Sequence, residues 1–222
     1  MVGKPSRTDD VTLGGAAPAP GVDSLGFVLP GLVHALGNAL FAVRGHVAIL
    51  GQNGATPGER QALARATDQA LAVFDLLRLF DPVSAATVDL QAGVLLSRLA
   101  GALQVPLRER GIRLECTHTS TATPTKVHGG PCVRALVGAV AVLAEAAPAA
   151  WRGRFVIDLC QQDLQQVQLR ITASAQRGCL PFAVAADSRL ALLAEELAGA
   201  GVQLQVKPGE QGVLVTLPVR GP

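Results

Sequence analysis

The strongest structural signal in the chain is the segment His34-Ala35-Leu36-Gly37-Asn38-Ala39-Leu40-Phe41-Ala42-Val43-Arg44-Gly45-His46. It lies in a periodic stretch from about residue 27 to residue 52. Apolar residues recur there alternately four and three positions apart, and this apolar seam comprises Leu36, Leu40, Val43, Val47 and Leu50. A heptad-like seam predicts an amphipathic helix in a helical bundle.

A second helix is predicted from about residue 59 to residue 80, after the loop formed by residues 53–58. Asp81-Pro82 ends it, because the residue before a proline is disfavoured in helical conformation. Two helices joined by a short loop form an antiparallel hairpin. A lone hairpin buries little apolar surface, so we expect a homodimer in which two hairpins form a four-helix bundle.

Beyond residue 82 the pattern changes to mixed helix and strand. We expect a helix capped by Asp89 and kinked or broken at Pro106, which runs towards Arg110. The expected elements that follow are a strand at 112–117, a buried helix at 131–147, a hairpin of strands 154–160 and 165–173, a helix at 188–200, and a closing hairpin of strands 203–207 and 213–219. This order predicts the α+β class, with helices packed on one face of a mixed sheet. The expected divisions are a mobile tail (1–26), the hairpin (27–82) and an α/β sandwich (83–222).

Composition narrows the classes of function. The chain has 222 residues, 49% hydrophobic residues, only 3% aromatics and a net charge of +2, with no block of like charge. Nucleic-acid binding usually needs a basic face or stacking aromatics, so we expect none. The four cysteines form no C-x-x-C pair, so no zinc or other metal site is expected.

The sequence also shows no pattern typical of a secretory signal or a membrane-spanning segment. The first residues carry charges with no apolar stretch behind them, which argues against a secretory signal. The longest apolar run, between Arg134 and Glu145, is too short to cross a bilayer. We therefore expect a cytoplasmic protein with reduced thiols and no membrane contact.

The first helix resembles the dimerisation and phosphoacceptor helix of sensor histidine kinases. In that family an Asn follows the phospho-accepting His by four residues, a Leu by six, an aliphatic residue by nine and often a Gly by eleven. This chain has His34, Asn38, Leu40, Val43 and Gly45 at those positions. Further similar segments are 75–80, 88–90, 109–112 and 192–212, so the resemblance covers nearly everything after residue 27. It implies a helical hairpin followed by a histidine-kinase-ATPase-like α/β sandwich.

The departures from the family concern ATP. Val142 stands where the family has the Asn that holds magnesium, and Ala173 lies near the position of the adenine-binding Asp. Residues 178–187 lack the second glycine-rich box, and Ala35 replaces the acid that follows the kinase histidine. Apolar side chains supply neither magnesium ligands nor hydrogen bonds to a base. The resemblance therefore implies a degenerate domain with no cofactor, and an active kinase with an unusual ATP lid is a rival.

This combination resembles the histidine phosphotransferases of bacterial phosphorelays, which pass phosphoryl groups between the receiver domains of response regulators. The resemblance implies that His34 is the catalytic residue and Asn38 its support. Receiver binding is assigned to Phe41, Arg44 and Gly45. A neutral imidazole is a nucleophile near neutral pH, and the spacing of His34, Asn38, Phe41 and Gly45 puts them on a stripe outside the apolar seam.

Plainer interpretations stay open for these residues. His34 can be a surface histidine without chemistry, and Asn38 and Arg44 can be solvated helix residues. Phe41 can pack within the bundle. For the whole chain, the alternative function is a non-catalytic pseudokinase adaptor that binds a receiver or a kinase, and a further rival is a purely structural dimer.

Overall fold

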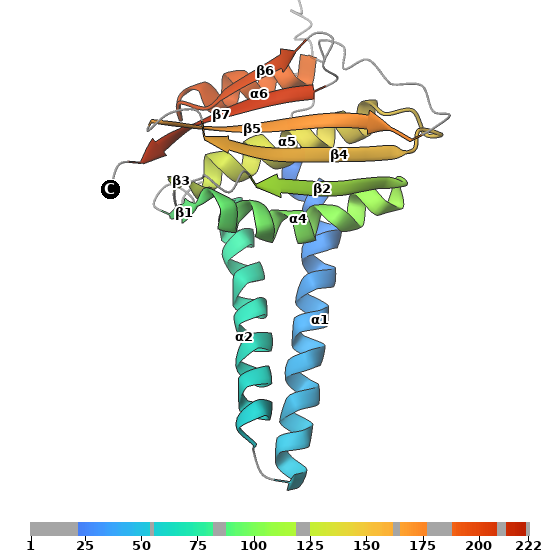
Figure 1. Cartoon of the computed structure of the whole chain (residues 1–222), viewed down its shortest axis with the longest axis vertical. Coiled ribbons are helices and arrows are strands. Elements are labelled where there is room, and N and C mark those ends of the chain that lie inside the picture. Colours follow the sequence, from blue (N-terminus) through green and yellow to red (C-terminus); the bar gives the residue numbers. More distant parts are fainter. Residues whose placement is uncertain are drawn as a thin grey trace, which may run out of the picture.

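A two-helix hairpin projects from an α/β sandwich (Figure 1). This computed structural model describes residues 22–53, 56–81, 88–118, 125–161, 165–176, 188–207 and 212–220. Most of the expected tail and the segment 178–187 lie outside these ranges. The predicted α+β class, with N-terminal helices followed by a mixed sheet, is confirmed.

The hairpin consists of α1 (Ser24–Asn53) and α2 (Pro57–Arg78). A capping box fixes the start of α2: the backbone N–H of Glu59 donates to the Thr56 hydroxyl at 3.3 Å, and the Glu59 carboxylate accepts from the Thr56 backbone N–H at 2.8 Å. Pro57 follows the cap, where a missing N–H costs nothing. Both predicted helices are present, with ends within three residues of those expected.

The first turns of α1 belong to the core of the sandwich. Val28 and Leu32 are fully buried, and the Arg110 guanidinium lies 5.2 Å from the centre of the Phe27 ring. A Cβ at Gly31 would lie 1.8 Å from the carbonyl oxygen of Ala102 in α4 (Ala92–Glu109). The base of the hairpin is therefore held directly against the sandwich.

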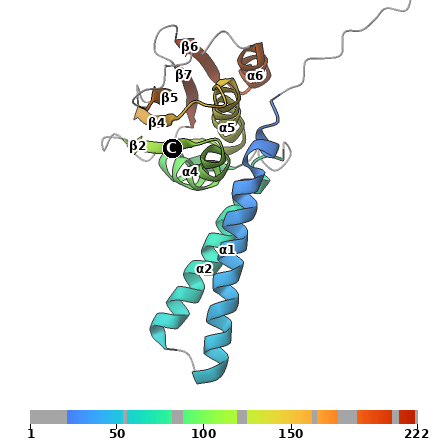
Figure 2. The same ribbon diagram turned by 90° about the vertical axis from the view of Figure 1, so that its right-hand side faces the viewer.

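Seven strands form one mixed sheet in the order β1-β3-β7-β5-β4-β2, with β6 also paired to β7. The strands are β1 (Asp89–Gln91), β2 (Ile112–His118), β3 (Lys126–His128), β4 (Gly153–Gln161), β5 (Gln166–Ala175), β6 (Gln203–Lys207) and β7 (Gly212–Arg220). Only the β2–β4 pair is parallel among the pairs described. The helices α4, α5 (Gly129–Ala146) and α6 (Ser188–Ala198) lie on one side of this sheet (Figure 2).

Alternation along β4 shows how the two faces of the sheet differ. Phe155, Ile157 and Leu159 are buried, whereas Arg154 is exposed and Asp158 is half-buried. The first set faces the helices and forms the core, because successive side chains of a strand point to opposite faces. The other face of the sheet carries polar side chains and is open.

One detail of the sequence prediction is wrong, and a second is narrowed. Asp89 does not cap α4: it lies in β1 opposite His128 of β3, and Gln91 stands at the N-cap with no side-chain hydrogen bond to the helix. Of the two outcomes predicted at Pro106, a kink or a break, the break is excluded, because α4 continues to Glu109. The proline ring is buried among the apolar residues of α4, so packing offsets the lost backbone hydrogen bond.

Two helices are long and apolar enough to cross a membrane by length and composition, within Ser24–Gly51 and Gly129–Ala146. The expectation from sequence rested on the apolar run between Arg134 and Glu145 alone, and it overlooked the longer apolar helix at the N-terminal end. The second helix is 78% buried inside the protein, whereas the first is 22% buried. The expected absence of membrane contact stays a prediction.

Candidate functional site

The face of α1 that turns towards α2 carries small residues. Ala39 is buried, and Ala35, Ala42 and His46 are half-buried at helical spacing. Ala35 lines a mainly apolar depression of about 210 Å³ together with Ala72 and other residues of α2 and α4. Small side chains on this face allow the two helices to pack closely.

A second face is apolar and uncovered. Leu29, Val33, Leu40 and Val47 are 41%, 60%, 51% and 53% exposed, respectively. At about 100° of rotation per residue they lie within about 40° of one another around α1. Leu71 and Phe74 of α2 are 57% and 49% exposed. We call these six residues the open apolar face; it includes Leu40 and Val47 of the predicted seam, and Leu36 is half-buried.

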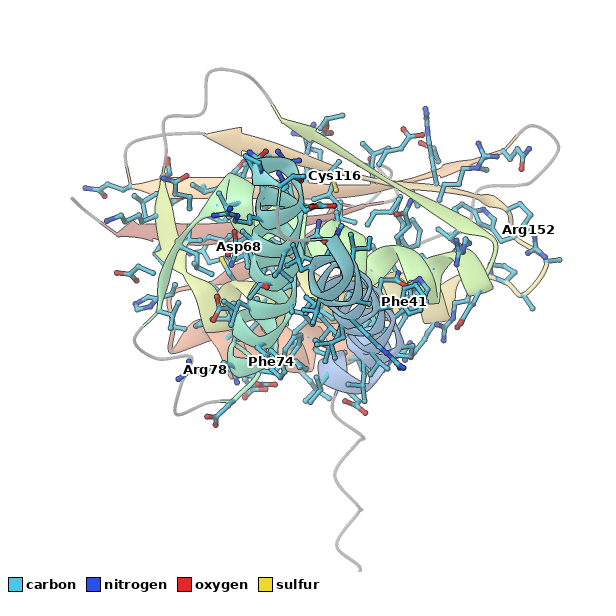
Figure 3. All side chains as sticks on the ribbon, turned by 90° about the horizontal axis from the view of Figure 1, so that it is seen from below. Phe41, Asp68, Phe74, Arg78, Cys116 and Arg152 are labelled. Atoms are coloured by element: carbon cyan, nitrogen blue, oxygen red, sulfur yellow. The ribbon has the colours of Figure 1, made fainter. Side chains whose placement is uncertain are left out.

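A third face carries the predicted histidine stripe, His34, Asn38, Phe41 and Gly45. All four residues are exposed, and Phe41 is 80% exposed. Helical geometry places the stripe roughly 130° from the open apolar face and roughly 100° from the face towards α2. Figure 3 shows Phe41 on the side of α1 away from α2, whereas Phe74 points to a different side of the hairpin. The stripe is therefore accessible even when the other two faces are covered.

Asn38 contacts the imidazole of His34. The side-chain nitrogen Nδ2 of Asn38 lies 3.1 Å from Nε2 of His34. When the amide donates, Nε2 holds the lone pair and Nδ1 carries the proton, so the contact selects a tautomer and fixes the ring orientation. An Nε2 lone pair becomes available for attack as soon as this one hydrogen bond opens. The predicted neighbourhood of His34 and Asn38 is thus present in the structure.

The structure separates Arg44 from the other site residues. Arg44 is exposed, but it lies about 80° around the helix from His34 and about 40° from Leu40.

Gly45 is on the stripe, and a Cβ there would meet nothing within 4 Å. Ile49, which is 43% exposed, extends the stripe by one turn and was not singled out from the sequence. The same helical phase would have identified it.

The positions expected to bind nucleotide in a kinase are apolar and buried. Val142 in α5 is 1% exposed, and Ala173 in β5 is 6% exposed. Within the described ranges the only buried polar side chains are those of Ser24 and Thr216. The same part of the chain contains no cluster of His, Cys, Asp or Glu suited to a metal ion.

Together, the fold and the stripe define an α+β chain that presents a hydrogen-bonded histidine on a projecting helical hairpin. No protein-family model and no curated protein matches its sequence.

Several solved structures are similar to the chain. The histidine kinase AdeS of Acinetobacter baumannii is 13% identical with a TM-score of 0.45, over 84% of this chain and 96% of that chain. A bacterial phosphotransferase is 14% identical with a TM-score of 0.39, over 90% and 98%. Histidine kinase ThkA in complex with response regulator protein TrrA is 10% identical with a TM-score of 0.43, over 88% and 61%. At such low identities and TM-scores these similarities assign no function.

Proposed function

We propose that the chain is a homodimeric histidine phosphotransferase that relays phosphoryl groups between response-regulator receiver domains. The observation that carries this proposal is the histidine stripe, in which an exposed His34 is held by Asn38 at 3.1 Å on a face separate from both packing faces. The His34-to-Gly45 spacing, which resembles that of sensor histidine kinases, supports the same assignment.

For phosphoryl transfer, the main task of the protein is to position the His34 imidazole in line with the phosphate of the receiver. The Nε2 lone pair of His34 attacks the phosphorus of an aspartyl phosphate on the receiver. The N–P bond forms as the P–O bond breaks, and the electron pair leaves with the aspartate carboxylate. The reverse step passes the group to a second receiver. Transfer of this kind depends mainly on in-line positioning and charge neutralisation, and the receiver supplies the aspartate and its magnesium.

Phe41 and Gly45 are suited to docking the receiver. Phe41 is 80% exposed, so its phenyl ring is an apolar anchor that the described residues leave largely uncovered. Gly45 leaves a flat patch one turn further along, where a receiver helix can approach the backbone. We assign Arg44 to the rim of this contact, because it lies off the stripe.

The test is transfer of label from receiver domains of the source organism, each phosphorylated with radiolabelled acetyl phosphate. Wild-type protein is expected to take up label that is lost in acid, because phosphohistidine is acid-labile. His34→Ala should abolish uptake while leaving the helical content unchanged. His46→Ala is the matched control, since His46 lies on the same helix but faces α2 and should retain the label.

The outcomes separate the candidate functions. Label on the His34→Ala variant would mean that another residue is the acceptor. Receiver binding without label on wild type would favour the non-catalytic adaptor. Uptake from radiolabelled ATP without any receiver would support the active kinase that Val142 and Ala173 argue against.

A further inference from the structure

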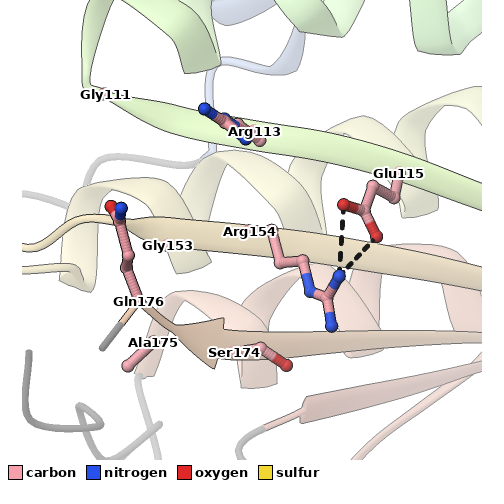
Figure 4. Close-up of a pocket in the computed structure, with 8 residues that line it drawn as sticks. All are labelled: Gly111, Arg113, Glu115, Gly153, Arg154, Ser174, Ala175 and Gln176. Carbon is pink, nitrogen blue, oxygen red and sulfur yellow. Dashed lines mark hydrogen bonds and ion pairs between the residues drawn. The ribbon is translucent and has the colours of Figure 1, made fainter.

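The open face of the sheet contains a polar depression of about 260 Å³ (Figure 4), and no residue of the histidine stripe lines it. It lies where β2 and β4 begin and β5 ends. Its lining includes Arg113 and Glu115 of β2, Arg154 of β4, and Ser174 and Gln176 at the end of β5. This is the face opposite to Phe155 and the helices, so the depression is separate from the buried Ala173 side of β5.

Strand register brings two arginines and a serine into one row. Arg113 lies opposite Arg154 in the parallel β2–β4 pair, and Arg154 lies opposite Ser174 in the antiparallel β4–β5 pair. Like charges directly opposite each other destabilise a sheet. Arrangements that lower stability concentrate at functional sites. The pair of facing arginines therefore indicates a binding site for an anionic ligand.

Glu115 offsets only part of this positive charge. Nη1 of Arg154 donates to both Glu115 carboxylate oxygens, at 3.0 and 3.3 Å. The guanidinium of Arg113 makes no hydrogen bond or ion pair with any residue in the described ranges. The row therefore keeps one free guanidinium and one that is shared with a carboxylate.

A third arginine stands at the edge of the depression. Gly111 has a φ of +74°, and a Cβ there would lie 2.7 Å from Nε of Arg152. Nη1 of Arg152 donates to the carbonyl oxygens of Ala149 and Trp151 at 3.0 and 2.9 Å, which fixes the side chain against the turn. Two arginines and one carboxylate, Glu115, line the depression, and Arg152 adds a further positive charge next to Gly111. Further along β4, Asp158 is balanced by Arg170 opposite it.

We propose that this depression binds the phosphate group of a small phosphate monoester. The three terminal oxygens of a phosphate monoester share a charge of about −2 and can accept from Arg113, Arg154 and the Ser174 hydroxyl at the same time, whereas a carboxylate carries a single charge. Arg154 already has a carboxylate partner, so a ligand must carry more charge to displace it. The volume suits one phosphate with a small substituent better than a large molecule.

Calorimetric titration of the full chain at low ionic strength tests the site, with inorganic phosphate and glycerol 3-phosphate as probes and glycerol as the neutral control. We expect saturable binding of both anions, weakening as salt is added. Arg113→Gln should weaken binding about tenfold or more, because hydrogen bonds to charged groups are the strong ones. Glu115→Gln should tighten it, since the competing carboxylate is removed.

Arg170→Gln is the matched control, because Arg170 lies on the same sheet but does not line the depression. It should bind like wild type, as should His34→Ala, so failure of this site and failure of phosphoryl transfer are distinguishable. No saturable heat with either anion would overturn the proposal, as would unchanged affinity in Arg113→Gln. Saturation by inorganic phosphate alone would restrict the ligand to the free ion and overturn the monoester assignment. Circular dichroism checks that these exposed substitutions leave the fold intact.

Discussion

Gly31 determines how closely α1 can approach α4. Its missing Cβ would lie 1.8 Å from the carbonyl oxygen of Ala102. Pro106 lies four residues after Ala102 and has no N–H to donate to that carbonyl, so the α4 backbone is open there to a close neighbour. A weak contact from the glycine Cα–H to this oxygen suits the geometry.

Gly31→Ala should therefore destabilise the protein by about 2 kcal/mol or more, because the added methyl group meets backbone that cannot move aside. Gly37→Ala is the matched control on the same helix, where a Cβ meets nothing within 4 Å. It should stabilise by up to about 1 kcal/mol through helix propensity. Urea unfolding followed by circular dichroism measures both changes. A Gly31→Ala variant as stable as wild type would mean that α1 and α4 do not cross this closely.

For single residues, the sequence predicted correctly which side chains share one face of α1, because helical periodicity alone decides this. The spacing of His34, Asn38, Phe41 and Gly45 placed them on one exposed stripe, as the structure shows. The role of Gly31 could not be predicted, because it depends on a contact with a helix about seventy residues away. The row of Arg113, Arg154 and Ser174 was missed for the same reason, since strand register joins residues from three separate segments.

Among the elements, α2 has a start defined by a full capping box, and we expect the stability of this cap to depend on pH. Hydrogen bonds from the backbone N–H and the hydroxyl of Thr56 lower the pKa of Glu59, and the nearby His46 lowers it further. The folded-state pKa is thus below the unfolded value near 4.5. A depressed carboxyl pKa contributes stability above the unfolded pKa, and that stability is lost as the pH falls through the folded pKa.

Glu59→Gln should accordingly lower the melting temperature at neutral pH, and the difference from wild type should shrink as the pH falls below 4.5. The glutamine keeps an acceptor for the Thr56 N–H, so the variant isolates the effect of the charge. Thermal unfolding across this pH range is the measurement. Glu195→Gln, an exposed position on α6, serves as the control. A difference that stays constant with pH would rule out a contribution from the Glu59 charge.

The prediction of elements succeeded where the periodic pattern was long. Both hairpin helices, α5, α6 and the four strands of the two β-hairpins lie within a few residues of their predicted ranges. The strands β1 and β3 have only three residues each, too few for alternation to show in sequence. They exist because β3 pairs with β7 and β1 with β3, and this pairing placed Asp89 in a strand.

On the scale of the whole molecule, the open apolar face is left partly exposed by the described part of the chain. Leu29, Val33, Leu40 and Val47 continue along α1, and Leu71 and Phe74 add to the face from α2. An apolar surface of this length on a helical hairpin favours association with a second copy, which would bury it in a four-helix bundle. The histidine stripe stays outside such an interface because it lies roughly 130° around α1.

Adjacent residues separate these two surfaces experimentally. Leu40 lies on the open apolar face and Phe41 on the histidine stripe, about 100° apart around the helix. Leu40→Asp should convert a dimer to a monomer, because an unpaired charge buried at the interface costs several kcal/mol. Leu40 is a sharper probe than Val43, which is half-buried in its own chain, so that an aspartate at Val43 would also disturb the monomer.

Phe41→Asp should leave the dimer intact and instead reduce transfer of label from a phosphorylated receiver, since the lost ring belongs to the proposed docking face. Light scattering coupled to gel filtration at micromolar concentration gives the mass of each variant, and circular dichroism checks its helical content. A monomeric wild type would contradict the dimer. Dissociation by Phe41→Asp but not by Leu40→Asp would place the interface on the histidine stripe. His34 would then be covered, and the relay proposal would fail with it.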